Sequence, residues 1–498
     1  MQSTLLFVIT TLAVAVSGQN LAPVTTEALQ SLISLDVLLA GAKQLQSFAD
    51  AHPGGNRVFG SPGHNDTVNF LYETLAATGY YDVEYQEFVE LFSGGNASLS
   101  TNGEEEEANL LTYTPSGSAS APLVAAQNLG CLPEDFPPEV ADCVVLISRG
   151  ECTFAEKATN AASAGAVGAV VYNNVEGPLA GTLGGVGDYT PTVGITQAAG
   201  EALLALLEAG TNVTADLQVN SILENRTTYN VIAETKGGDH DNVIALGAHT
   251  DSVEQGPGIN DDGSGTIGIL HVAVALSNFT VTNAVRFCFW SAEEFGLLGS
   301  TYYVSQLNQT ASEIAKIRAY LNFDMIASPN YVYAIYDGDG SSFNLSGPPG
   351  SAEIEYDFQG FYIAKGVNYT STAFDGRSDY GPFLENNIPA GGLFTGAEEV
   401  KTEEEAVAFG GTADVAYDEN YHQAGDTIDN LNSEAFLLNT QSIANSIALY
   451  ATGGGLDRIP LVTPPSVKRH WQPSGRKTKR ELAHAGHSHC NSRDTPAV

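Results

Sequence analysis

The second half of the chain alternates short apolar runs with longer amphipathic segments, beginning near Asn230. The short runs predict buried strands and the longer segments predict helices. Predicted strands cover residues 242–249, 284–291 and 317–325, and predicted helices cover residues 264–278, 296–307 and 433–451. Apolar strands that alternate with helices are typical of an α/β domain, in which a parallel or mixed central β-sheet is flanked by helices on both faces.

The first half of the chain shows other patterns. From Thr25 to about Phe92 the pattern is helical, with the glycine-rich loop HPGGNRVFGSPGHND inside it. Residues 100–111, STNGEEEEANLL, combine Gly, Asn and four consecutive Glu, which predicts a linker. The block from about residue 109 to 218 is then rich in Ala, Gly and Val, and AASAGAVGAVVYNN predicts a helix followed by a short strand. We interpret this block as a compact inserted domain, because 498 residues exceed the usual span of one core.

The charge of the chain argues against nucleic acid or an anionic membrane as a partner. The formal net charge is -38, from 58 acidic and 20 basic residues, whereas phosphate binding needs basic patches. The acidity is uneven: from Gly454 to the end, 8 Lys and Arg face 3 Asp and Glu. That basic tail carries dibasic pairs and a His-rich end, AHAGHSHC, which fits either a processed extension or a disordered tail, and we favour the disordered tail.

The N-terminus predicts export. An apolar run followed by small residues predicts a signal peptide cleaved near Gly18. The alternative is a membrane anchor, but the apolar run is short for a segment that spans a bilayer. The expected location is therefore extracellular (secreted), or the vacuolar lumen, with no membrane anchor after cleavage. Eight N-x-S/T sequons support this route and predict a glycoprotein. They are Asn65, Asn96, Asn212, Asn225, Asn278, Asn308, Asn344 and Asn368.

Polar residues capable of metal binding follow the predicted strands. After the first strand come His249 and Asp251, and Asp261 and Asp262 follow a glycine loop before a helix. The pair Glu293–Glu294, then Asp324, and finally His422 in YDENYHQAGDTID follow later elements. Ligands gather at the carboxyl ends of such strands. His nitrogens and carboxylate oxygens suit zinc, and one carboxylate can bridge two ions while one of the adjacent glutamates acts as general base.

Each of these residues also has a plain structural explanation. Asp261 or Asp262 could serve only as a helix N-cap, either glutamate as a solvated loop residue, and His422 as a surface histidine. Taken singly, those explanations are the stronger ones. Five such residues in separate loops of one sheet domain favour the metal site.

The motifs GAHTDSV, GINDDGSG, SAEEFGLLGS, NFDMI and YHQAGDTIDN together resemble those of the secreted or vacuolar two-zinc aminopeptidases, the aminopeptidase Y-like or leucine aminopeptidase group. The similarity runs from about Asn20 to Gly454, and GNRVFGSPGHNDT resembles the family's N-terminal segment. The inserted block resembles a protease-associated domain. The resemblance implies a zinc exopeptidase fold with a β-rich α/β insertion. The expected divisions are 1–18 signal peptide, 19–108 N-terminal peptidase part, 109–225 protease-associated domain, 226–454 catalytic domain and 455–498 tail.

The resemblance also implies roles for individual residues. His249 and Asp324 would bind one zinc, Glu294 and His422 the other, and Asp261 would bridge them. Glu293 would be the general base, and Tyr421 would stabilise the oxyanion. Asp251 would orient His249, Ser378 would lie behind His422, and Asp375 and Arg377 would lie near the pocket for the substrate amine.

Cys131 would pair with Cys152, leaving Cys143 free, and Cys288 in a strand-like run is expected to be a buried thiol. The family often has cysteines beside the last histidine, whereas this chain has Asn420 and Gly425. That loop is therefore not held by a disulfide.

The expected function is hydrolysis of N-terminal, Leu-type apolar residues from peptides with a free N-terminus, by a monomer with two Zn²⁺ per subunit and a water bridging them. Two alternatives stay open. A related two-zinc carboxypeptidase or dipeptidase would need a basic pocket, and the motifs are poor in Lys and Arg. A non-catalytic binding protein with a peptidase fold would be expected to have lost ligands, and here all five and the base are present.

Overall fold

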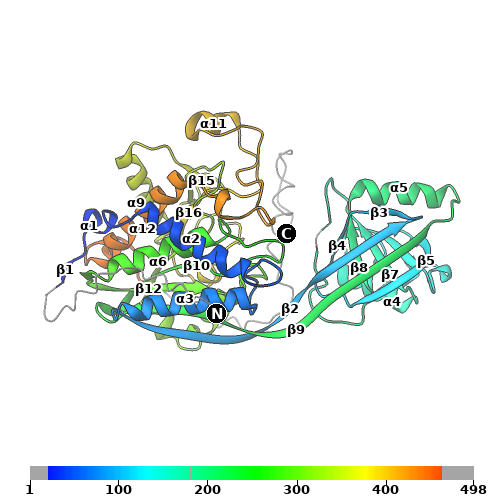
Figure 1. Ribbon diagram of the computed structural model, residues 1–498, viewed down its shortest axis with the longest axis horizontal. Coiled ribbons are helices and arrows are strands. Elements are labelled where there is room, and N and C mark those ends of the chain that lie inside the picture. The colour runs from blue at the N-terminus through cyan, green and yellow to red at the C-terminus, as the bar shows by residue number, and fades with distance from the viewer. Residues whose placement is uncertain (1–20, 180, 463–498) are drawn as a thin grey trace, which may run out of the picture.

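The structure of the protein, a computed structural model, describes residues 21–179 and 181–462. Figure 1 shows two lobes, joined by a ribbon made of the long strands β2 and β9. The signal-peptide prediction for residues 1–18 lies outside the described residues, as does the tail beyond Val462.

The larger lobe is built on a mixed sheet whose strand order is β15-β14-β16-β13-β10-β12-β9. Its central strand β10 pairs in parallel with both β12 and β13, while β9 lies antiparallel on β12 and β14 lies antiparallel on β16. This α/β architecture, with helices on the sheet and an inserted second lobe, confirms the predicted fold class. The strands are β9 Thr214–Thr235, β10 Asp239–His249, β12 Asn283–Trp290, β13 Ile317–Phe323, β14 Ala334–Tyr336, β15 Thr370–Thr372 and β16 Ala390–Phe394, and a separate pair is β1 Ala22–Pro23 with β11 Phe279–Thr280.

Helices cover this sheet, and the predicted helices over 264–278, 296–307 and 433–451 appear as α6, α7 and α12. The helices of the lobe are α1 Thr26–Gln30, α2 Leu35–Asp50, α3 Pro62–Ala77, α6 Gly263–Leu276, α7 Leu298–Leu307, α8 Ala311–Lys316, α9 Ser351–Lys365, α10 Gly381–Glu385, α11 Glu403–Phe409 and α12 Ser433–Ala451, with 3-10 turns at Ile428–Asn430 and Gly455–Arg458.

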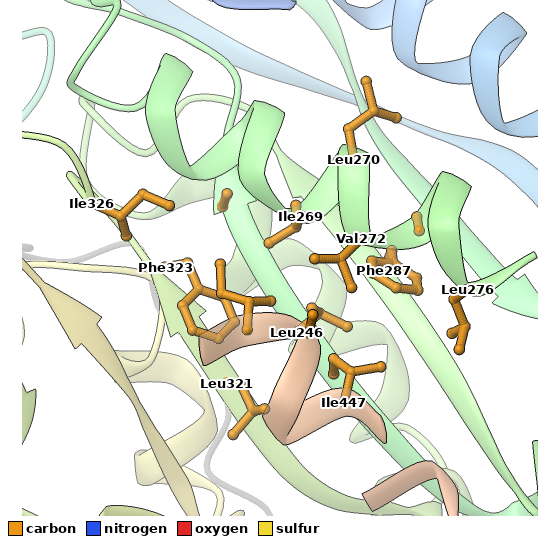
Figure 2. Close-up of a cluster of buried hydrophobic side chains, with 14 of the residues drawn as sticks. Leu246, Ile269, Leu270, Val272, Leu276, Phe287, Leu321, Phe323, Ile326 and Ile447 are labelled. Atoms are coloured by element: carbon orange, nitrogen blue, oxygen red, sulfur yellow. The ribbon is translucent and has the colours of Figure 1, made fainter. Parts of the chain in front are cut away.

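Helix α6 forms the centre of the core. Ile269, Val272 and Leu276 of this helix share one buried apolar cluster with Leu246 of β10 and Ile447 of α12, as Figure 2 shows. The helix is apolar almost all round because α2, α3 and α12 cover the faces that the sheet does not. This packing fixes the N-terminus of α6, which directly follows Asp261 and Asp262.

The helical prediction for residues up to Phe92 is wrong beyond α3. Residues Tyr81–Thr101 form the strand β2, which pairs with β9 in 21 antiparallel positions from Tyr81–Thr235 to Thr101–Ala215. The stretch YDVEYQEFVELF alternates apolar and polar residues, which suits a strand with one covered face. The chain therefore passes between the lobes within paired strands.

The linker predicted over residues 100–111 is also wrong. Asn102 and Gly103, with φ of 51° and 86°, form a tight turn that folds Glu104–Glu106 (β3) back onto the end of β2. An Asn-Gly pair at this position is typical of a two-residue hairpin. Ala108–Leu110 (β4) then pairs with β8, so the acidic run lies within the smaller lobe.

The smaller lobe is a second α/β unit in which β5, β6, β7 and β8 are parallel neighbours and β4 closes one edge. Its elements are β5 Gly117–Ala125, β6 Val144–Ser148, α4 Phe154–Ser163, β7 Gly168–Tyr172, β8 Thr192–Ile195 and α5 Gln197–Glu208, with 3-10 turns at Pro133–Asp135 and Pro138–Val140. A disulfide joins Cys131 to Cys152, while Cys143 and the buried Cys288 are free thiols, as expected.

The first residues assigned to the tail pack against the larger lobe. Leu456, Ile459 and Val462 are buried, and the Arg318 guanidinium donates to the carbonyls of Leu456 and Ile459. The larger lobe thus extends past residue 454 to at least Val462. Over the described ranges, we find no helix with both the length and the apolar character needed to cross a bilayer.

Candidate metal centre

The candidate ligands meet at one edge of the sheet. His249 is the last residue of β10, Asp324 directly follows β13, and Glu293 and Glu294 lie just beyond the end of β12. Because these three strands are parallel neighbours, their carboxyl ends lie together and bring the four side chains to one place.

Asp261 lies between two histidines. Its Oδ1 is 3.0 Å from Nε2 of His249, and its Oδ2 is 3.1 Å from Nε2 of His422. One carboxylate therefore directs each of its oxygens at a different imidazole, as a ligand that bridges two ions must do.

The remaining acids divide between the two sides of Asp261. Asp324 Oδ1 lies 3.6 Å from His249 Nε2, and Glu294 Oε2 lies 3.0 Å from His422 Nε2. Glu293 Oε2 is 3.7 Å from His249 Nε2, and its side chain is buried. The result is two groups of donors that share Asp261: His249 with the carboxylates of Asp324 and Glu293, and His422 with the carboxylate of Glu294.

These residues fit zinc. Zinc ligand atoms bound at roughly 2.0–2.1 Å in a tetrahedron lie about 3.3 Å apart, and the ligand-to-ligand distances of 3.0–3.6 Å fall around this value. His422 Nε2 and both oxygens of Glu294 are buried and form no hydrogen bond with any residue in the described ranges, although they face each other. Side chains arranged in this way converge on a common point, where a cation would satisfy them.

The electrostatics of the site also favour a cation. Burial lowers the pKa of His249, but the nearby carboxylates of Glu293 and Asp324 outweigh it, so the pKa is raised well above its ordinary value. The carboxylates thus create a strongly negative potential at the buried end of the sheet.

Comparison with known proteins agrees with this geometry. Residues 230–447 match Peptidase family M28, and residues 119–203 match the PA domain. The chain is 55% identical over 466 residues to a probable leucine aminopeptidase 2 of Aspergillus fumigatus, covering 93% of this chain and 92% of that protein. The chain belongs to peptidase family M28. Leucine aminopeptidase 2 of Arthroderma otae is likewise 55% identical, over 91% of this chain and 90% of its own length.

Solved structures of similar proteins share the M28 fold. An aminopeptidase from Aneurinibacillus sp. strain AM-1 superposes with a TM-score of 0.67 at 28% identity, covering 89% of this chain and 98% of the other. A zinc aminopeptidase from Bacillus subtilis has a TM-score of 0.59 at 26% identity, covering 87% and 96%. The smaller lobe contains the PA match, and the larger lobe contains the M28 match.

In this M28 chain Asp251 fixes the two adjacent glutamates. Its Oδ1 accepts from the backbone N–H of Glu293 at 3.1 Å, and its Oδ2 accepts from that of Glu294 at 3.3 Å. His249 Nδ1 lies 3.2 Å from the carbonyl oxygen of Asp251 and 3.6 Å from its carboxylate. Asp251 thus contacts the histidine through its backbone carbonyl, which lies closer to Nδ1 than its carboxylate does, while its carboxylate positions the candidate base.

Asp262 has a supporting role that links three segments. Its side chain caps α6 by accepting from Gly265 N, and it also accepts from the backbone N–H groups of Met325 and His249. The peptide bond between Asp261 and Asp262 is cis. Asp262 therefore holds the three ligand loops of His249, Asp261 and Asp324 in register.

A polar network that the sequence analysis missed holds the His422 loop. The carboxylate of Asp426 accepts from the backbone N–H groups of Asn260 and Asp261, and Asn430 donates to both Asp418 and Asp426. Asn420, which stands where the family often has cysteine, donates to Asn430 at 2.7 Å. These hydrogen bonds tie the His422 loop to the loop of the bridging aspartate without a disulfide. The motif QAGDTIDN carried the signal, but its acids were assigned no role.

The expectation that Ser378 lies behind His422 is wrong. Its Oγ donates to Asp324 Oδ2 at 2.6 Å and accepts from Asn322 at 2.8 Å, so it supports the ligand on the opposite side of the site. The cause is the path of the 373–380 loop between β15 and α10, which brings Ser378 beside the end of β13. Asp375 is engaged locally, since it accepts from the Tyr380 hydroxyl and from the backbone of Arg377.

Tyr421 and Arg377 form a second layer beside His422. The Tyr421 ring stacks on the His422 imidazole with centroids 3.8 Å apart, and Arg377 Nη2 donates to the Tyr421 hydroxyl at 3.4 Å. Arg377 is itself held by Glu398 at 2.8 Å and Glu399 at 3.1 Å. The arginine therefore fixes the tyrosine at the edge of the metal centre.

Proposed function

We propose that this chain is a zinc aminopeptidase with two ions per subunit. His249 and Asp324 would hold one ion, Glu294 and His422 the other, and Asp261 would bridge them. The observation that carries the proposal is Asp261, whose two oxygens lie 3.0 and 3.1 Å from different histidines. Zinc bound there would supply a Lewis acid and a water molecule with a pKa near neutrality.

The chain's own residues supply the proton transfers. Glu293 is buried beside His249, and its backbone is fixed by Asp251, so its carboxylate is placed to take a proton from the attacking water. It then gives the proton to the leaving amine. Tyr421, positioned by stacking on His422, donates a hydrogen bond from its O–H to the oxygen on which negative charge develops.

The charges near the site favour a free amine as the group recognised. A carboxypeptidase needs a cation available for the terminal carboxylate, but Arg377 is already paired with Glu398 and Glu399. A cationic N-terminus suits the acidic surroundings of Glu293 and Asp324. The names of the relatives, leucine aminopeptidase 2, support Leu-type apolar residues at the substrate's N-terminus.

The substrate test compares Leu-p-nitroanilide with its N-acetylated form and with a peptide cleavable only from its C-terminus. We expect hydrolysis of the free-amine substrate alone, loss of activity with a strong chelator and recovery with zinc. Equal rates on the acetylated substrate, or release of C-terminal residues, would contradict an aminopeptidase.

Tyr421→Phe is expected to lower kcat about 100-fold while changing KM little, because removal of one oxyanion donor costs about that much. Tyr356→Phe, a change at an exposed tyrosine on α9, serves as the matched control and should leave kcat unchanged. Steady-state kinetics on Leu-p-nitroanilide measure the effect. An unchanged kcat in Tyr421→Phe would remove the tyrosine from the mechanism.

We further propose that the protein is a secreted, glycosylated monomer. Support comes from the disulfide and from the eight sequon asparagines, all of which are at least partly exposed. Mass spectrometry of the mature protein before and after deglycosylation checks this proposal. An intact N-terminus without glycans would contradict it.

A further inference from the structure

A segment far from the ligands in sequence clamps the loop that joins two of them. Arg57 lies between α2 and α3, and its side chain is fully buried. Its Nε donates to the carbonyl of Pro257 at 2.8 Å, its Nη2 donates to Gly258 at 2.5 Å, and its Nη1 donates to Thr250. These carbonyls belong to the loop that runs from His249 to Asp261.

The three carbonyls come from both ends of that loop. Thr250 directly follows His249, whereas Gly258 lies three residues before Asp261. The planar guanidinium presents its donors in a fixed fork, so it sets the separation of the two loop ends in a way that a single flexible ammonium group does not.

The backbone of Arg57 strengthens the same clamp. Its N–H donates to Ser252 Oγ at 2.9 Å, and its carbonyl accepts from Ser252 N at 3.2 Å. Ser252 Oγ also donates to the carbonyl of Gly256 at 3.0 Å. The side chain of Arg57 therefore holds the start and the end of the loop, and its backbone holds the middle of the loop through Ser252.

The charge of Arg57 also matters to the site. Burial lowers the pKa of Arg57, and the acids Asp251, Asp426, Asp262 and Asp261 act in the opposite direction. The guanidinium stays protonated in proteins, and its hydrogen bonds go to carbonyls. Arg57 is thus a fixed positive charge close to the acids of the metal centre. This charge offsets the repulsion among their carboxylates.

We infer that Arg57 is a positioning residue of the metal centre, which sets the spacing of His249 and Asp261 through the 250–258 loop and so sets the affinity for zinc. The inference rests on the proposed zinc site. Arg57 of the motif GNRVFG would thus position the zinc ligands without itself contacting substrate or metal.

The test uses Arg57→Lys, which keeps the charge but loses the fork, and Arg458→Met, a change at an arginine whose side chain is half exposed, as the control. Zinc affinity is measured by competition with a chromogenic chelator, together with kcat and KM at saturating zinc and thermal unfolding of the metal-free protein. We expect Arg57→Lys to bind zinc at least about tenfold more weakly and to have a lower kcat, with KM within about threefold of wild type. The control should match wild type.

If Arg57→Lys fails to fold, Ser252→Ala removes the hydrogen bonds that the Ser252 hydroxyl makes with Arg57 N and Gly256 O, and should weaken zinc binding in the same direction. Zinc affinity equal to wild type in the folded variant would overturn the inference, even if thermal stability fell, because Arg57 would then be purely structural. A wild-type protein that binds no zinc would overturn the proposed function as well, so the two failures are distinguishable.

Discussion

Glu293→Gln is expected to lower kcat by at least about two orders of magnitude while leaving zinc content unchanged. The amide keeps the size and the hydrogen bonds of the backbone to Asp251, but it cannot take a proton from water. Because Glu293 is not one of the residues proposed to hold zinc, the metal sites should stay filled. Steady-state kinetics and elemental analysis on the same preparation measure both quantities.

The neighbouring glutamate provides the contrast. Glu294 Oε2 faces His422 at 3.0 Å, so Glu294→Gln should lose zinc along with activity. The two adjacent substitutions are chemically identical and differ only in the direction in which the side chain points. Full activity in Glu293→Gln, or loss of zinc in both variants, would show that the roles have been misassigned.

Asp261→Asn is expected to lower both zinc occupancy and kcat, the latter by more than about 100-fold. An amide offers a single oxygen and no charge, so it cannot serve both His249 and His422. Residues that only support a ligand cost about 10- to 100-fold when changed, and a shared ligand should cost more.

Asp262→Asn, at the neighbouring helix cap, is an informative comparison. Its side chain accepts backbone hydrogen bonds from three loops, and an amide oxygen can keep part of them. We expect a smaller loss of zinc there than in Asp261→Asn. A bridging variant that kept two zinc ions and wild-type turnover would contradict the role of Asp261.

The sequence was sufficient to predict the centre of the larger lobe. The strand β10 ends at His249, and polar residues follow the apolar strands β12 and β13. Parallel strands bring such residues together, so the pattern predicts the approach of His249 and Asp324. The assignment of Glu293 as base and Glu294 as ligand needed the family resemblance, because periodicity does not tell which of two adjacent side chains faces a metal.

Other features depended on contacts that a pattern does not carry. Arg57 acts through backbone carbonyls, which any sequence supplies, so nothing in the 250–258 loop identifies its partner. Ser378 supports Asp324 and not His422 because its loop packs beside the end of β13, and the sequence pattern does not show the path of that loop. The alternation of apolar and polar residues in β2 is mixed with spacing that also suits a helix, and the Asn102–Gly103 turn directly precedes a run of glutamates that is typical of a linker.

Anomalous diffraction from crystals of the zinc-loaded protein will show whether Asp261 bridges two zinc ions. Two peaks are expected, one beside His249 and Asp324 and one beside Glu294 and His422, with a carboxylate oxygen of Asp261 adjacent to each. A single peak at full zinc occupancy, or two peaks of which only one contacts Asp261, would mean that Asp261 does not bridge two ions.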